Sequence, residues 1–138
     1  MAGLTKTETK LIYACSGAAD VGAIADQVAR RLRSEGVAKM TCLAGIGAEL
    51  PSYVQSAKGV DTNITIDGCQ VACAKITLEK IGVTPTSYIL TDMGLIKGET
   101  PVTEKIIVQM SEKIKNMNGT SVPPIQMATG GCSCGGKC

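Results

Sequence analysis

Cysteine is the residue type in this chain that offers the most chemistry, and four of its seven cysteines occupy related places. Each of the four comes where a predicted β-strand ends or the next helix begins: Cys15, Cys42, Cys69 and Cys73. In an α/β fold the carboxyl ends of the strands border one crevice, so residues that are far apart in the sequence meet there. Thiolates hold Zn²⁺ in tetrahedral sites. The pattern therefore predicts a metal site of four thiolates, with zinc as the expected cofactor.

The pair Cys69 and Cys73 adds a second line of reasoning. A helix is predicted over residues 69–80, and a spacing of four places both cysteines on one helical face. The N–H groups and the dipole at a helix start favour a thiolate over a thiol. The same two residues therefore also suit a different class of protein, a redox or sulfur-transfer enzyme in which one of them is the nucleophile.

Asp67 precedes Gly68 and Cys69 and has three candidate roles. It is expected first as a carboxylate that forms the turn after a strand. It also suits an outer acceptor that hydrogen-bonds to the metal ligands, or a general base.

Three more cysteines crowd the C-terminal segment, at Cys132, Cys134 and Cys138. Residues 118–138 are rich in Gly, Pro, Ser and Thr and show no periodicity, which predicts a flexible tail. Its thiols form a second candidate metal or thiol site. They suit Zn²⁺ or Cu⁺, donation of a ligand to the main site, or sulfur exchange.

The composition excludes several function classes. The chain has no histidine, so it contains no Cys/His zinc pattern, no Cys–His nucleophile pair and no Ser–His–Asp triad. Its net charge is only +2 and it lacks Phe and Trp, so we expect no nucleic acid as a partner. The partner that the residues indicate is a metal ion, and no protein partner is indicated.

The absence of a long apolar segment bears on location. Residues 1–9 are polar, and no apolar run approaches the roughly 20 residues of a membrane helix. We therefore expect no membrane association and a cytoplasmic protein, in which thiols stay reduced. The odd number of cysteines agrees with metal ligands rather than a disulfide framework.

Strand-like and helix-like segments alternate along the chain. Short apolar or alternating runs predict strands at 11–15, 39–43, 63–67 and 87–91. Helical spacing predicts helices at 21–32, 51–59 and 69–80 and a last one that begins at residue 100 or 103, whose core stripe is Ile106, Ile107, Met110, Ile114 and Met117.

This alternation predicts an α/β fold: one three-layer domain with a mostly parallel four-stranded sheet, flavodoxin- or Rossmann-like. The strand order 2-1-3-4 is expected by analogy with flavodoxin-like sheets. The domain is expected to span residues 10–117, between an extension at 1–9 and the tail at 118–138. The Gly-rich loops at 16–19 and 44–47 leave open a third function class, a module that binds a small anion or a nucleotide.

Three segments carry a family resemblance: YACSGAADVGAIADQVARRL at 13–32, MTCLAGIGA at 40–48 and IDGCQVACAK at 66–75. With them the chain resembles the DGC family of domains, which takes its name from an Asp-Gly-Cys motif, here residues 67–69. The resemblance implies zinc binding through four cysteines, which fall on Cys15, Cys42, Cys69 and Cys73. It implies no enzymatic activity, and it does not extend beyond residue 115.

Overall fold

A computed structural model describes residues 8–119 of the 138-residue chain. Its centre is a single sheet of four strands: β1 (Lys10–Ala14), β2 (Lys39–Met40), β3 (Thr62–Asp67) and β4 (Thr86–Ile89). The strands lie in the order β2-β1-β3-β4, and every neighbouring pair is parallel. The predicted fold class and strand order are confirmed.

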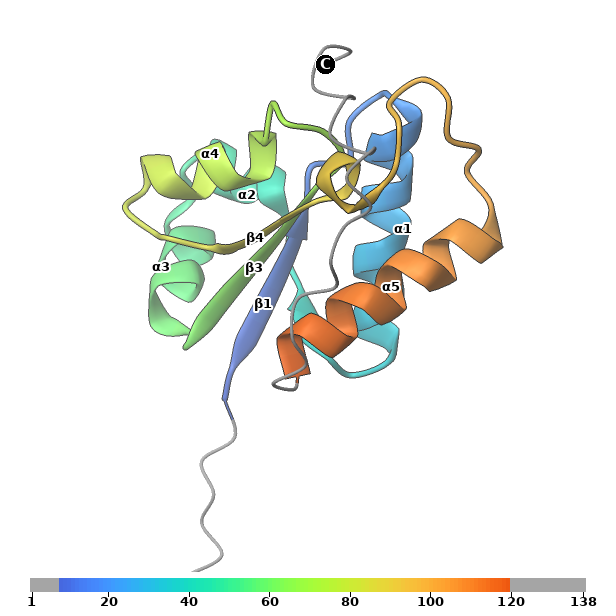
Figure 1. The fold of residues 1–138 in the computed structure, drawn as a ribbon. Helices are drawn as coiled ribbons and strands as arrows, with labels where there is room; N and C mark the ends of the chain where they lie inside the picture. The colour runs from blue at the N-terminus through green and yellow to red at the C-terminus, as the bar shows by residue number, and fades with distance from the viewer. Residues whose placement is uncertain (1–7, 120–138) are drawn as a thin grey trace, which may run out of the picture.

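Helices cover both faces of the sheet, which gives three layers (Figure 1). The helices α1 (Asp20–Ser34) and α5 (Glu104–Gly119) lie on one face. The opposite face carries α2 (Leu43–Gly47), α3 (Pro51–Gly59) and α4 (Cys73–Lys80). The sheet is thus buried on both sides, as expected of parallel strands.

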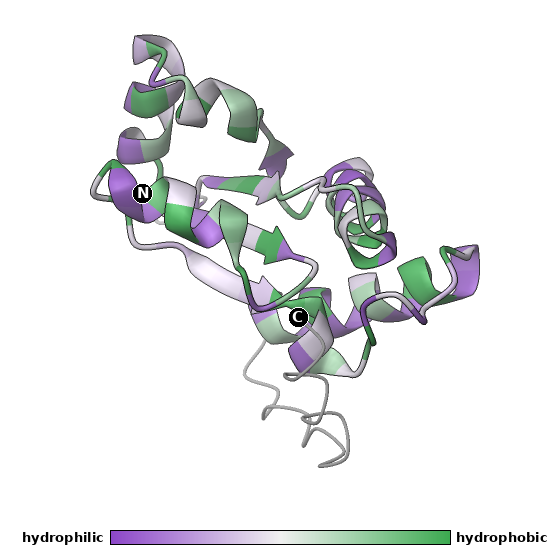
Figure 2. Ribbon diagram, turned by 90° about the horizontal axis from the view of Figure 1, so that it is seen from above, coloured by the Kyte–Doolittle hydropathy of each residue, from purple (hydrophilic) through white to green (hydrophobic). Residues whose placement is uncertain are grey.

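Each face has its own aliphatic core. The larger core joins Ile12, Ile64 and Ile66 of the sheet to the apolar stripes of α1 and α5. The smaller core surrounds Tyr13, whose hydroxyl donates to Asn63 Oδ1 at 2.9 Å. Hydrophobic and hydrophilic residues alternate along the helices when the molecule is viewed from above, as expected of helices with one buried side (Figure 2).

The predicted stripe of the last helix is confirmed in α5. Ile107, Met110 and Ile114 are buried, and Ile106 and Met117 pack against the same core. The helix begins at Glu104 and ends at Gly119.

Two predicted strands are shorter than expected. The strand predicted over residues 39–43 ends at Met40, because the chain leaves the sheet after one last hydrogen bond from Thr41 N to Ile12 O of 3.1 Å. It then enters α2, which replaces the turn expected at 44–47. The strand predicted over 87–91 ends at Ile89 and continues as a 3₁₀ helix, η1 (Leu90–Met93).

The predicted start of the helix at residues 69–80 is wrong. Ala72 adopts the left-handed conformation, with φ 56° and ψ 48°, and this breaks any helix that would run through it. Helix α4 therefore begins at Cys73, and residues 68–71 form a turn. The argument that Cys69 and Cys73 share a helical face fails for this reason.

The expected tail at 118–138, with Cys132, Cys134 and Cys138, lies beyond the described residues apart from the end of α5. Within residues 8–119, no helix combines the length and the apolar character that a membrane span requires.

Candidate thiol site and adjoining cleft

Cys15 and the Asp67–Cys69 segment lie side by side at the carboxyl edge of the sheet. The register pairs Ala14 with Ile66, and Cys15 N donates to Ile66 O at 3.1 Å. One step further, Gly68 N donates to Cys15 Sγ at 3.3 Å. This contact places a backbone donor of the β3–α4 turn against the sulfur of Cys15.

Asp67 caps helix α4 from the end of β3. Its Oδ1 accepts from Ala74 N at 2.7 Å and its Oδ2 accepts from Lys75 N at 3.1 Å. Burial raises the pKa of Asp67, while these two N–H groups and the charge of Lys75 oppose the rise. The carboxylate thus satisfies two N–H groups at the start of a helix whose own N-cap, Ala72, offers no side-chain acceptor.

Gly68 lets two backbone segments approach closely. A Cβ built on Gly68 would lie 2.6 Å from the carbonyl carbon of Val21 in the first turn of α1. Any larger residue would push the β3–α4 turn away from α1, and with it the neighbouring thiols.

Cys69 is half-buried and faces a lysine from a different part of the chain. Lys97 Nζ lies 3.6 Å from Cys69 Sγ. Asp20 at the start of α1 holds this loop, because its carboxylate accepts from Gly98 N at 2.9 Å and from Thr100 N at 3.1 Å. Lys97 was missed from the sequence, since no local pattern links it to residue 69.

Cys73 lies close enough to Cys15 and Cys69 for their charges to act on it. Partial removal from water, the negative charge of Asp67 and then the two other thiols raise the pKa of Cys73. The expectation that the helix start favours the thiolate is wrong for Cys73, because these effects outweigh the backbone hydrogen bond that lowers its pKa. A raised pKa weighs against Cys73 as a thiolate nucleophile.

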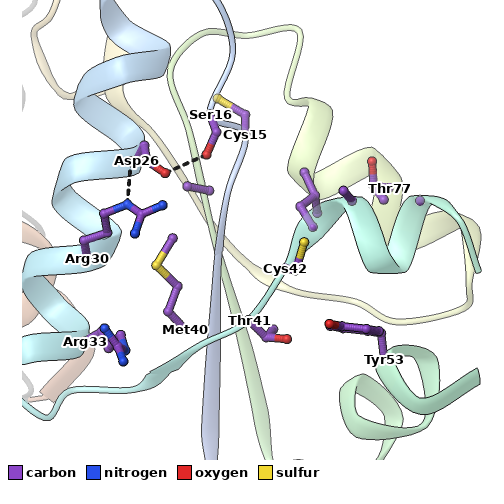
Figure 3. Close-up of a pocket in the computed structure, with 14 residues that line it drawn as sticks. Cys15, Ser16, Asp26, Arg30, Arg33, Met40, Thr41, Cys42, Tyr53 and Thr77 are labelled. Atoms are coloured by element: carbon purple, nitrogen blue, oxygen red, sulfur yellow. Dashed lines mark hydrogen bonds and ion pairs between the residues drawn. The ribbon is translucent and has the colours of Figure 1, made fainter. Parts of the chain in front are cut away.

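Cys42 stands apart from the other three cysteines. It is exposed at the N-cap of α2 and, with Cys15, lines an open cleft of about 930 Å³ (Figure 3). Cys69 and Cys73 do not line this cleft. Among residues 8–119, no three acidic or cysteine side chains are already arranged as a metal-ligand shell. The structure thus places Cys15 and Cys69 at neighbouring strand ends with Cys73 near enough to interact with their charges, and it places Cys42 with Cys15 on the cleft.

The cleft also has a basic wall that the sequence analysis missed. Arg30 and Arg33 of α1 face it, and Arg30 Nε donates to Asp26 Oδ2 at 2.7 Å. Ser16, next to Cys15, donates from Oγ to Asp26 Oδ1 at 2.9 Å. The three-residue spacing of the two arginines was the available signal, but on the sequence alone it describes a solvated helix face.

The chain belongs to the DGC domain family, which matches residues 11–115. It is also 38% identical over 88 residues to the anaerobic and virulence modulator AnvM of Pseudomonas aeruginosa. That alignment covers 63% of this chain and 67% of AnvM. No solved structure gives a significant match.

Proposed function

We propose that this protein binds a metal ion, zinc, through the thiolates of Cys15, Cys42, Cys69 and Cys73. The observation that carries the proposal is the convergence of Cys15, Cys69 and Cys73 at one edge of the sheet, close enough for each to affect the ionisation of Cys73. Membership of the DGC family supports the choice of these residues.

The surroundings of the thiols suit a bound cation with several thiolates. Four thiolates around Zn²⁺ carry a net charge of −2, which neighbouring donors must offset. Gly68 N at Cys15 Sγ and Lys97 Nζ at Cys69 Sγ supply a donor and a positive charge. A cation would also remove the mutual repulsion that raises the pKa of Cys73.

Cys42 is the ligand that requires a local adjustment. It is exposed and precedes α2, a helix of only five residues, so a small shift at residues 41–42 changes the position of its thiol. A closed site of four cysteines is structural in character, and its metal-binding energy adds to the folding free energy.

Metal analysis of the full-length, reduced chain tests the proposal. We expect one zinc per chain in the core site, lost when Cys69 and Cys73 are both changed to Ser. A protein with the three tail cysteines changed to Ser is the matched control and should keep that zinc. Equal zinc content in the Cys69→Ser/Cys73→Ser protein and the unmodified chain would contradict the proposal.

The single Cys42→Ser change tests the one proposed ligand that is exposed at the N-cap of α2. With four ligands, we expect weaker zinc binding by about one to two powers of ten, measured by competition with a chromophoric chelator. An unchanged affinity would remove Cys42 from the ligand set while leaving the other three in place.

A further inference from the structure

The cleft beside the thiol site is lined by both arginines and cysteines. The metal proposal accounts for the cysteines but not for the arginines. The α1 wall of the cleft carries Arg30 and Arg33, and its opposite wall carries Cys42 and Tyr53, with Cys15 between them at the end of β1 (Figure 3). A volume of about 930 Å³ lies in the range of sites that hold small organic molecules.

The two guanidinium groups are available to a ligand. Within residues 8–119, the Arg33 carbonyl accepts a hydrogen bond from Gly36 N, and no hydrogen bond or ion pair involves the Arg33 guanidinium group. Arg30 uses its Nε for Asp26, which leaves the terminal nitrogens for another acceptor. Asp26 in turn accepts from Ser16, so Arg30, although exposed, is tied by this chain of hydrogen bonds to the wall of the cleft.

Planar guanidinium groups bind oxyanions through paired, charge-assisted hydrogen bonds. We infer that the cleft binds a small organic oxyanion, a carboxylate or a phosphate, whose charged group pairs with Arg30 and Arg33 and whose other end lies against the thiols of Cys42 and Cys15. This site goes beyond the proposed metal function: it shares Cys15 and Cys42 with the proposed ligands, but its anion-binding end is formed by Arg30 and Arg33.

Two alkylating reagents of nearly equal size test the inference. Iodoacetate and iodoacetamide both transfer a CH₂ group to sulfur: the S–C bond forms, the C–I bond breaks, iodide leaves and the thiol proton passes to water. Iodoacetate carries a negative charge, whereas iodoacetamide is neutral. The cleft should raise the rate of iodoacetate relative to iodoacetamide at Cys42, because the positive charges of Arg30 and Arg33 on the facing wall concentrate the anion in the cleft that Cys42 lines.

The rates are measured residue by residue, by peptide mass spectrometry of the reduced full-length chain. Arg33→Met should lower the iodoacetate-to-iodoacetamide ratio at Cys42 by about three- to tenfold. Lys105→Met, which removes the same charge from an exposed position on α5, should leave that ratio unchanged. Cys73 is exposed but outside the cleft, so its own ratio should be the same in all three proteins.

Competition with unreactive anions identifies the ligand class. Succinate or inorganic phosphate should slow iodoacetate at Cys42 in the unmodified chain, and glycerol should not. The more effective of the two anions assigns a carboxylate or a phosphate ligand. No protection by either one, or an Arg33→Met ratio equal to that of the unmodified chain, would overturn the inference.

A second measurement uses the metal-bound protein, in which the thiols cannot be alkylated. In that form, succinate or phosphate should still shift the amide NMR signals of Thr41 and Cys42, and Arg33→Met should weaken this binding by about tenfold. Absence of any shift would overturn the inference even if zinc binds as proposed. Anion effects in a chain that takes up no zinc when zinc is supplied would overturn the metal proposal alone.

Discussion

Each residue of the Asp-Gly-Cys motif at 67–69 has a different structural role. Asp67 caps α4, Gly68 permits the contact with Val21, and Cys69 presents a thiol to Lys97. The motif is therefore as much a device for packing a turn between β3, α1 and α4 as it is a source of ligands.

Replacing Asp67 by Ala should lower the free energy of unfolding by about 2–4 kcal/mol, because the N–H groups of Ala74 and Lys75 lose their acceptor in a buried place. Urea unfolding at neutral pH measures this. Asp92→Ala is the control, since it removes an exposed carboxylate that, among residues 8–119, accepts from the Gln70 side chain, and it should cost below about 0.5 kcal/mol. Equal losses in the two variants would contradict the capping role.

Gly68→Ala should destabilise the protein by about 2–3 kcal/mol, because its new methyl group would lie 2.6 Å from the backbone of Val21. Thermal or urea unfolding measures the loss. Gly59→Ala at the end of α3 is the matched control: nothing lies within 4 Å of its Cβ, so it should be neutral or stabilising by up to about 1 kcal/mol. A neutral Gly68→Ala would show that the turn has room to move.

At the scale of elements, the loop after η1 is tied to the first turn of α1 by one carboxylate. Partial burial alone would raise the pKa of Asp20, but the N–H groups of Gly98, Thr100 and Val21 outweigh it and hold the pKa below its usual value. The folded state therefore binds the Asp20 proton less tightly than the unfolded state does. This stabilising contribution is present above the unfolded pKa and is lost as the pH falls through the folded pKa.

Asp20→Asn should consequently be less stable than the unmodified chain at pH 6, and the difference should shrink as the pH falls below about 4. Urea unfolding at several pH values measures it, and amide hydrogen exchange at Gly98 and Thr100 should become faster in the variant. A difference that stays constant from pH 6 to pH 3 would contradict the role of the ionised carboxylate.

The contact between α1 and α5 contains a buried apolar side chain and a surface ion pair, so two variants can compare how much each contributes to the free energy of unfolding. Ile114 is fully buried, whereas Glu35 pairs with Lys115 at 2.7 Å near the surface. Ile114→Ala should cost about 2–5 kcal/mol and Glu35→Gln less than about 1 kcal/mol, by urea unfolding. A Glu35→Gln loss as large as that of Ile114→Ala would mean that the ion pairs dominate this interface.

Periodicity and strand-end placement were enough to predict the elements of the sheet and the stripe of α5. The failures concern places where tertiary contacts override local pattern. No sequence feature of residues 69–72 predicts the left-handed conformation of Ala72. Helix α2 depends on the packing of Gly45 against the Tyr53 ring, since a Cβ on Gly45 would lie 2.7 Å from that ring. The convergence of Cys15 and Cys69 followed from topology, but the separate position of Cys42 did not.

At the scale of the whole molecule, the described residues form both cores without the C-terminal segment. The buried clusters extend only to Ile114, with Met117 packed against the larger one. Truncation after Gly119 should therefore change the free energy of unfolding by less than about 0.5 kcal/mol and leave the core zinc in place, by urea unfolding and metal analysis. A truncated chain that unfolds would make residues 120–138 part of the folded structure.

Strand β1 lies inside the sheet, between β2 and β3, although it precedes the other elements of the described residues in the chain. Its main partner, β3, begins at Thr62, and α4 with Cys73 follows later still. During synthesis β1 can pair with β2 early, but Cys15 meets Cys69 and Cys73 only after β3 and the start of α4 have been made. Capture of an ion by these three cysteines would therefore join β1, β3 and α4 at a stage when β4 and α5, which complete the larger core, are still to be made.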